Sequence, residues 1–152
     1  MITTMKEGDD NMNPEKKPSV LVCVTGQYDC DRLINAGFEK AVELGLELHV
    51  LSVHMPVNNC SFLSDEIEHL YRVSKDLGAD MTIAFHKDAP KTAVDFARKI
   101  NAKYIITGMP DDRPRGFVDI VSELLPKSHL TMVTKNGELL EYSSAYAVKA
   151  TA

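Results

Sequence analysis

The chain has 152 residues, of which 44% are apolar and 26% are charged, and its formal net charge at pH 7 is −5. This length and composition predict one globular domain with an apolar core of its own. The acidic balance argues against non-specific binding to nucleic acids or anionic membranes. No apolar run approaches the roughly 20 residues that a membrane span requires.

The two ends of the chain differ in composition from the middle. Residues 1–17 are polar, contain Pro14 and lack the apolar segment of a signal peptide, so they predict a disordered leader. Residues 143–152 are small and rich in Ala and Ser, which predicts a flexible or partner-docked tail. Three cysteines without metal-ligand spacing are typical of reduced thiols. We therefore expect a cytoplasmic protein with one folded domain at residues 18–142.

Residues 18–142 alternate between two hydrophobic patterns. Short apolar runs are typical of strands covered on both faces, and apolar residues three or four positions apart are typical of helices with one buried face. In chain order, these patterns predict a strand at 19–25, a helix at 29–44, a strand at 46–53, a helix at 64–77, a strand at 81–85, a helix at 89–100, a strand at 104–107, a short helix at 117–125 and a strand at 130–134. The turn sequence Asn136-Gly137 predicts a hairpin arm at 138–142.

Five strands that alternate with four helices are typical of an α/β protein with a parallel sheet. Because crossovers between parallel strands are right-handed, we expect a single doubly wound sheet with the strand order 3-2-1-4-5, counted along the chain. The order then reverses between the first and fourth strands, and ligands bind outside the carboxyl ends of strands at such a point. Thr25-Gly26 and Thr107-Gly108 are therefore expected to face the same crevice.

Several segments resemble the universal stress protein superfamily. They are VLVCVTG at 20–26, DRLI at 31–34, AVELGLELHVLSV at 41–53 and the segment 88–108, which matches the family's third helix and fourth strand. The resemblance covers residues 18–134 and is closest to the universal-stress-like domain of bacterial potassium-sensor kinases. It implies a homodimer with an adenine-nucleotide α-hydrolase-like fold, and many members of the family bind ATP or AMP.

The nucleotide-binding pattern of that family is incomplete in this chain. Nucleotide-binding members carry an Asp at the end of the first strand and a G-x-x-G-x9-G-[ST] loop after the fourth. Thr25 stands at the Asp position, Asp111 replaces the second glycine, and Phe117 follows Gly116 in place of Ser or Thr. Small residues in this loop allow backbone N–H groups to approach a phosphate closely. A carboxylate in the loop repels the phosphate and so weakens its binding.

The loop also contains groups that favour an anion. Pro110 removes one N–H and Asp112 adds a second acid, whereas Arg113 and Arg115 carry guanidinium groups that suit phosphate. The residues expected around the crevice are Thr25, Gly26, Gln27, Val53, Gly108, Arg113, Arg115, Gly116 and Phe117.

Three functional hypotheses follow from these residues. The favoured one is a non-enzymatic, universal-stress-like regulatory protein whose crevice senses a small ligand and orders the loop at 108–116. The second is an ATP- or AMP-binding protein with slow ATP hydrolysis, in which Asp111 and Asp112 hold Mg²⁺. The third is a ligand-free interaction module with an eroded nucleotide loop. We expect no catalytic residues and no resident metal, because the chain has no G-x-S-x-G elbow, Walker loop or H-E-x-x-H motif.

The remaining interpretations concern the last strand, the cysteines and two histidines. Leu130, Met132 and Thr134 are expected at a dimer interface, because a bare apolar edge strand invites pairing. Cys23 is expected in the core, and Cys60 in a loop without a role. Cys30 lies near a helix N-terminus, which makes a redox sensor the least favoured alternative. His54 and His86 follow the second and third strands and are expected at the crevice rim or on the surface.

Overall fold

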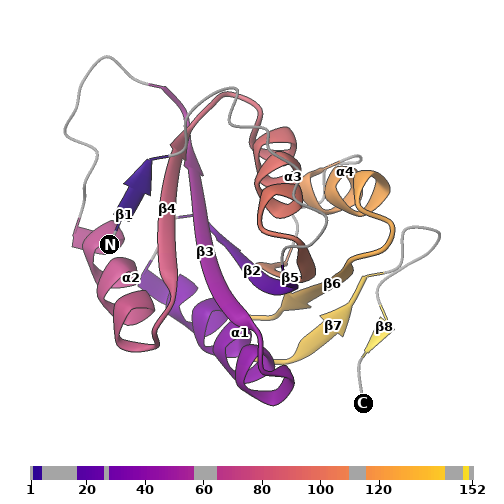
Figure 1. The fold of residues 1–152 in the computed structure, drawn as a ribbon, viewed down its shortest axis with the longest axis horizontal. Helices are drawn as coiled ribbons and strands as arrows, with labels where there is room; N and C mark the ends of the chain where they lie inside the picture. Colours follow the sequence, from indigo (N-terminus) through magenta and orange to yellow (C-terminus); the bar gives the residue numbers. More distant parts are fainter. Residues whose placement is uncertain are drawn as a thin grey trace.

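The computed structural model describes residues 2–4, 17–25, 28–56, 65–109, 116–142 and 149–150. Its centre is an eight-stranded sheet with the order β1-β4-β3-β2-β5-β6-β7-β8 (Figure 1). The elements are β1 (Ile2–Thr4), β2 (Ser19–Val24), the 3₁₀ turn η1 (Tyr28–Cys30), α1 (Asp31–Leu44), β3 (Glu47–His54), α2 (Asp65–Asp76), β4 (Asp80–Phe85), α3 (Ala89–Lys99), β5 (Ala102–Gly108), α4 (Phe117–Leu124), β6 (His129–Val133), β7 (Leu139–Glu141) and β8 (Lys149–Ala150).

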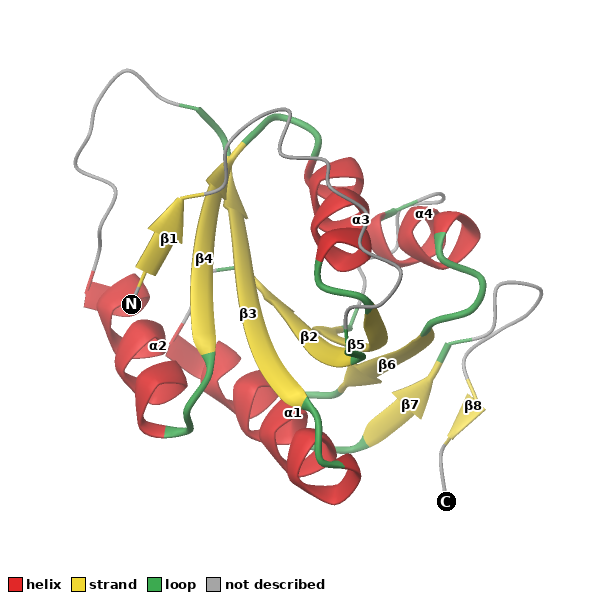
Figure 2. Cartoon of the chain, in the orientation of Figure 1, coloured by secondary structure: helices red, strands yellow, loops and turns green. Residues whose placement is uncertain are grey.

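The five central strands have the predicted arrangement. The strands expected first to fifth are β2, β3, β4, β5 and β6, and their order β4-β3-β2-β5-β6 is the predicted order 3-2-1-4-5. All neighbours among them are parallel. Helices α1 and α2 cover one face of the sheet and α3 and α4 cover the other (Figure 2). The prediction of a doubly wound α/β sheet is therefore confirmed.

Strand β2 shows how the core is built on both faces of the sheet. All six of its residues are buried, as the continuous apolar run predicts for a central parallel strand. Val20, Val22 and Val24 pack on the side of α1, whereas Leu21 and Cys23 pack on the side of α3 and α4. Burial raises the pKa of the Cys23 thiol to about 12, so this cysteine is a core residue, as predicted.

The predicted leader contains one strand. Ile2–Thr4 forms β1 and pairs in parallel with β4, with Ile2 opposite Met81 and Thr4 opposite Ile83. The expectation of disorder across residues 1–17 is therefore wrong for these three residues. The physical reason is that β4 would otherwise have an open edge, and the β-branched residues of β1 suit a strand that pairs with it. In the predicted tail, β8 pairs with β7.

Strand β6 is not a bare edge, so the reason given for placing it at a dimer interface is wrong, while the homodimer itself stays a prediction. The hairpin arm predicted at 138–142 contains β7, which pairs antiparallel with β6 and places Leu140 opposite Met132. Two further backbone bonds flank this ladder, from Thr134 N to Glu138 O at 2.9 Å and from Tyr142 N to Leu130 O at 2.9 Å. The outer edge of β6 is thus already paired within the chain, and a second copy cannot add to it there.

Candidate functional site

The strand order reverses between β2 and β5, as predicted. These two strands are parallel neighbours, with Val22 opposite Ile106, so their carboxyl ends lie side by side. Thr25 directly follows β2, and Gly108 is the last residue of β5. The structure therefore brings Thr25 and Gly108 to the same edge of the sheet, where ligands bind in open α/β folds.

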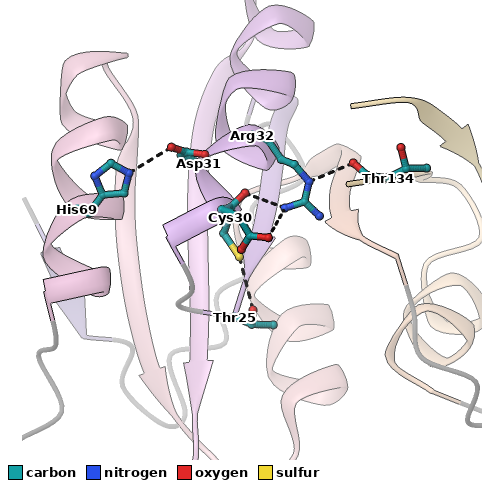
Figure 3. Close-up of polar contacts among 7 residues, drawn as sticks. Thr25, Cys30, Asp31, Arg32, His69 and Thr134 are labelled. Atoms are coloured by element: carbon teal, nitrogen blue, oxygen red, sulfur yellow. Dashed lines mark hydrogen bonds and ion pairs between the residues drawn. The ribbon is translucent and has the colours of Figure 1, made fainter. Parts of the chain in front are cut away.

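Thr25 contacts the start of helix α1. Its side-chain oxygen Oγ1 lies 3.5 Å from Sγ of Cys30, the residue that precedes α1 (Figure 3). Thr25 is exposed, whereas Cys30 is only 4% exposed. Redox-sensing cysteines are accessible to solvent, so the burial of Cys30 argues against that role.

Arg32 reaches the same edge of the sheet from the first turn of α1. Its Nε donates a hydrogen bond to the backbone oxygen of Thr134 at 3.1 Å, and its Nη1 donates to the backbone oxygen of Asp29 at 2.7 Å (Figure 3). Nη1 also lies 3.5 Å from Oδ2 of Asp29. A Cβ atom built on Gly108 would lie 3.9 Å from Nη2 of Arg32. The guanidinium group therefore stands beside the end of β5.

Sequence reasoning missed Arg32, although one signal was present. A cation in the first turn of a helix opposes the helix dipole and costs about 0.3–1 kcal/mol. Such a residue suggests a partner outside its own helix. The partner here is Thr134, which is 102 residues away in sequence and cannot be found from local spacing.

The neighbouring residue Asp31 joins α1 to α2. Its Oδ2 lies 3.2 Å from Nε2 of His69 (Figure 3). Both side chains are more than a third exposed, so this contact contributes little to stability in water. It does direct the Asp31 carboxylate toward α2, whereas Arg32 extends toward the ends of β5 and β6.

His54 and His86 lie at the carboxyl ends of β3 and β4, as predicted. Nε2 of His54 lies 2.7 Å from Oγ of Ser52, which is fully buried, and its ring packs against Phe85. His86 donates its backbone N–H to the backbone oxygen of His54 at 2.9 Å, and its Nδ1 accepts from the backbone N–H of Asp88. These bonds close the ends of two strands around His54.

We predict that His54 makes the stability of the domain depend on pH. Burial lowers the pKa of this imidazole from 6.5, so the folded state binds its proton less readily than the unfolded state does. The contribution of neutral His54 is complete above the unfolded pKa and is lost as the pH falls below it toward the lower folded pKa. Urea unfolding at about pH 7.5 and about pH 5.5 should show a smaller acid-induced loss for His54→Gln than for wild type. Equal losses would contradict the prediction.

Val53 and Phe117 lie on the α3/α4 side of the sheet. Both are partly buried and pack against the apolar cluster that includes Leu51, Val118 and Met132. Gly116 has an extended backbone and directly precedes α4. These two apolar side chains and the start of α4 therefore belong to the same layer of the fold.

Helix α4 is linked to the hairpin arm. The hydroxyl group of Tyr142 donates a hydrogen bond to Oδ1 of Asp119. This bond is the main cause that raises the pKa of Tyr142 to about 12, because the carboxylate stabilises the protonated phenol. The bond therefore joins the first turn of α4 to Tyr142, the residue that follows β7.

Some predicted site residues lie outside the described part of the chain. They are Gly26, Gln27, Asp111, Asp112, Arg113 and Arg115, and Cys60 lies outside it as well. Within the described ranges, no group of three His, Cys, Asp or Glu side chains is placed to hold a metal ion. Across those same residues, no helix has both the length and the apolar character needed to cross a bilayer.

A cavity of about 380 Å³ lies at the opposite end of the sheet. It is formed by the end of α1, the turn that follows α2 and the first residues of β3 and β4, and its lining includes Phe38, Val42, Glu47, His49 and Asp80. Two carboxylates in this lining disfavour an anionic ligand. The carboxyl ends of β2 and β5, where Arg32 lies, are therefore the better candidate for binding an anion.

No protein-family model matches the chain, and no curated protein matches its sequence. Solved structures do match its fold. A universal stress protein in complex with cAMP is 12% identical, with a TM-score of 0.57, and the match covers 79% of this chain and 97% of that one. A universal stress protein from Archaeoglobus fulgidus in complex with dAMP is 16% identical, with a TM-score of 0.50 and coverages of 78% and 97%.

The fold also occurs in a protein described by another activity. The macrolide-efflux protein from Streptococcus pneumoniae is 15% identical, with a TM-score of 0.58, and the match covers 95% of this chain and 53% of that one. Identities this low establish a shared fold and leave the function to be argued from the site. The chain has the α/β fold found in universal stress proteins.

Proposed function

We propose that this chain is a universal-stress-type regulatory protein that binds an adenine nucleotide at the carboxyl ends of β2 and β5 and does not turn it over. The observation that carries the proposal is the reversal of strand order at which Thr25 and Gly108 meet. The matching folds of proteins solved with cAMP and dAMP support the choice of an adenine nucleotide as ligand.

The described residues have the chemical properties that such a ligand needs. Gly108 has no side chain, and a Cβ there would meet other atoms only at 3.8 Å and beyond, so a ligand can approach its backbone. Val53 and Phe117 offer apolar contacts of the kind that hold a base. Nucleotide sites generally combine such apolar walls with a few polar groups.

Regulation would act through helix α4. A ligand that contacts Gly116 or Phe117 biases the position of α4, and Asp119 passes that bias to Tyr142 at the end of the hairpin arm. The arm is the surface that we assign to a partner or to a second copy of the chain.

Cytoplasmic location, a role in stress response and kinship with the domain of potassium-sensor kinases belong to the same proposal.

One observation favours the second candidate, a ligand-free interaction module. Thr25 occupies the position of the family's Asp, and its hydroxyl group contacts Cys30. A threonine engaged within the protein is a weaker ligand for ribose or a metal ion than a carboxylate is. Slow ATP hydrolysis would require Mg²⁺ at Asp111 and Asp112, which lie outside the described residues.

Native mass spectrometry of the purified protein tests the proposal first, because it reports oligomeric state and bound nucleotide together. Calorimetric titration with ATP, AMP and cAMP should then give saturable binding. The variant Gly108→Val should weaken that binding at least about tenfold, because the added side chain occupies space next to the ligand. The backbone tolerates valine there, since φ of Gly108 is outside the left-handed region.

The matched control for this variant is Lys103→Val. It introduces the same side chain at an exposed position near the amino end of the same strand. We expect Lys103→Val to bind like wild type. A protein that carries no nucleotide and does not bind added nucleotide would contradict the proposal and favour the interaction module.

A further inference from the structure

We propose that Arg32 is the anion-recognition residue of this crevice, and that it holds a phosphate group of the ligand beside Gly108. The inference rests on the proposed ligand site and adds to it the residue that recognises the ligand's charge. The contacts of its guanidinium group suit it to this role.

The guanidinium group of Arg32 is held in place from two sides. Its Nε donates to the Thr134 oxygen at 3.1 Å, after β6, and its Nη1 donates to the Asp29 oxygen at 2.7 Å, in η1. The side chain is only 24% exposed. A planar guanidinium fixed by two carbonyl groups has lost most of its rotamer freedom before a ligand arrives, so less binding free energy is spent on ordering it.

The third nitrogen of Arg32, Nη2, lies next to Gly108 at the end of β5. Nη2 has no hydrogen-bond partner among the described residues, and it stands 3.9 Å from the place of a Cβ on Gly108. Because residue 108 is a glycine, the space next to Nη2 is not filled by a side chain. Two N–H groups on a fixed cation are suited to a phosphate oxygen, for which charge-assisted bonds are short and strong.

The acidic neighbours of Arg32 set the expected strength of this contact. Asp29 has a carboxylate oxygen 3.5 Å from Nη1, and its side chain is 57% exposed, so solvent screens the pair. Asp31 contacts His69 on α2. The positive charge of Arg32 is therefore reduced but not cancelled. Removing the charge of Asp29 should strengthen binding of an anion, which is the opposite of the effect of removing Arg32.

The test compares AMP with adenosine, which lacks the phosphate, by calorimetric titration. The ratio of the two affinities should fall about tenfold in Arg32→Met, while adenosine affinity stays within about twofold of wild type. In Asp29→Asn the ratio should rise about threefold. Arg72→Met is the matched control, because Arg72 is an exposed α2 residue whose Nη2 lies 3.8 Å from Oε2 of Glu68, and it should keep the wild-type ratio.

A second measurement separates this inference from the proposed function. Inorganic phosphate is titrated into the ¹⁵N-labelled full chain, and the Nε–Hε resonance of Arg32 is followed by NMR.

If AMP and adenosine both bind but Arg32→Met leaves the ratio of their affinities unchanged, the proposed function stands and the inference is overturned. If no adenine compound binds but phosphate shifts the Arg32 resonance, the inference stands without the proposed function. If neither occurs, both are overturned. Should Arg32→Met fail to fold, the Asp29→Asn ratio decides.

Discussion

Met132→Asp should abolish folding of the domain. Met132 has no exposed surface and lies in the apolar cluster on the α3/α4 side of the sheet, where its strand neighbours are Thr107 on β5 and Leu140 on β7. A carboxylate at this position must be buried without a partner or protonated, and either change costs more than about 4 kcal/mol. That is a large part of the about 5–15 kcal/mol by which domains are stable.

The control for Met132→Asp is Leu139→Asp, which places the same charge at a side chain that is 40% exposed on β7. We expect Leu139→Asp to remain folded and to lose less than about 1 kcal/mol of unfolding free energy. Circular dichroism and urea unfolding of both variants distinguish the two interpretations of this strand. A folded, monomeric Met132→Asp protein would show that Met132 contacts a partner subunit, as the sequence suggested, and would contradict its place in the core.

Gly37→Ala should lower the free energy of unfolding by about 2 kcal/mol, although alanine normally favours a helix over glycine. A Cβ atom at residue 37 would lie 2.3 Å from Cγ2 of Val22 and 3.1 Å from Cδ1 of Leu48. Val22 is fully buried in β2, and a β-branched side chain has few rotamers to adopt. Helix α1 must therefore move away from the sheet to make room for the methyl group.

The test for this clash is a double-mutant cycle with Val22→Ala, measured by urea unfolding. Val22→Ala removes the methyl group that the new Cβ would strike, so Gly37→Ala should be much less destabilising in that background. The two residues should show a coupling free energy of about 1 kcal/mol or more. Additive losses would mean that the close approach of α1 to β2 does not limit the residue at position 37.

The sheet could be predicted from the sequence because its central strands are defined by local pattern. The apolar run that forms β2 is continuous and the run that forms β3 is nearly so, and neither depends on the rest of the fold. Gly45, whose φ is 68°, marks the end of α1. The position of Thr25 beside Gly108 then followed from the handedness of crossovers. Both features are consequences of short-range chemistry and one topological rule.

The elements that were missed depend on pairing between distant residues. Ile2–Thr4 is too short to form a strand alone and acquires one only along the edge of β4. The hairpin arm was predicted, but its pairing with β6 was not, because β6 was expected to be a bare edge strand. The role of Arg32 could be recognised only from the three-dimensional structure, which places the backbone oxygen of Thr134 next to its guanidinium group. Charged residues in a helix have no pattern that reveals such a partner.

The hairpin between β6 and β7 has a consequence for how the chain avoids aggregation while it folds. Pairing β6 with β5 closes a long segment of chain and is slow, whereas β7 follows β6 across the short turn at 134–138, whose Gly137 has φ 86°. Hairpins of this kind form in about 1–10 μs. The apolar outer edge of β6 is therefore covered almost as soon as it exists, which leaves little time for it to capture the same strand in a neighbouring molecule.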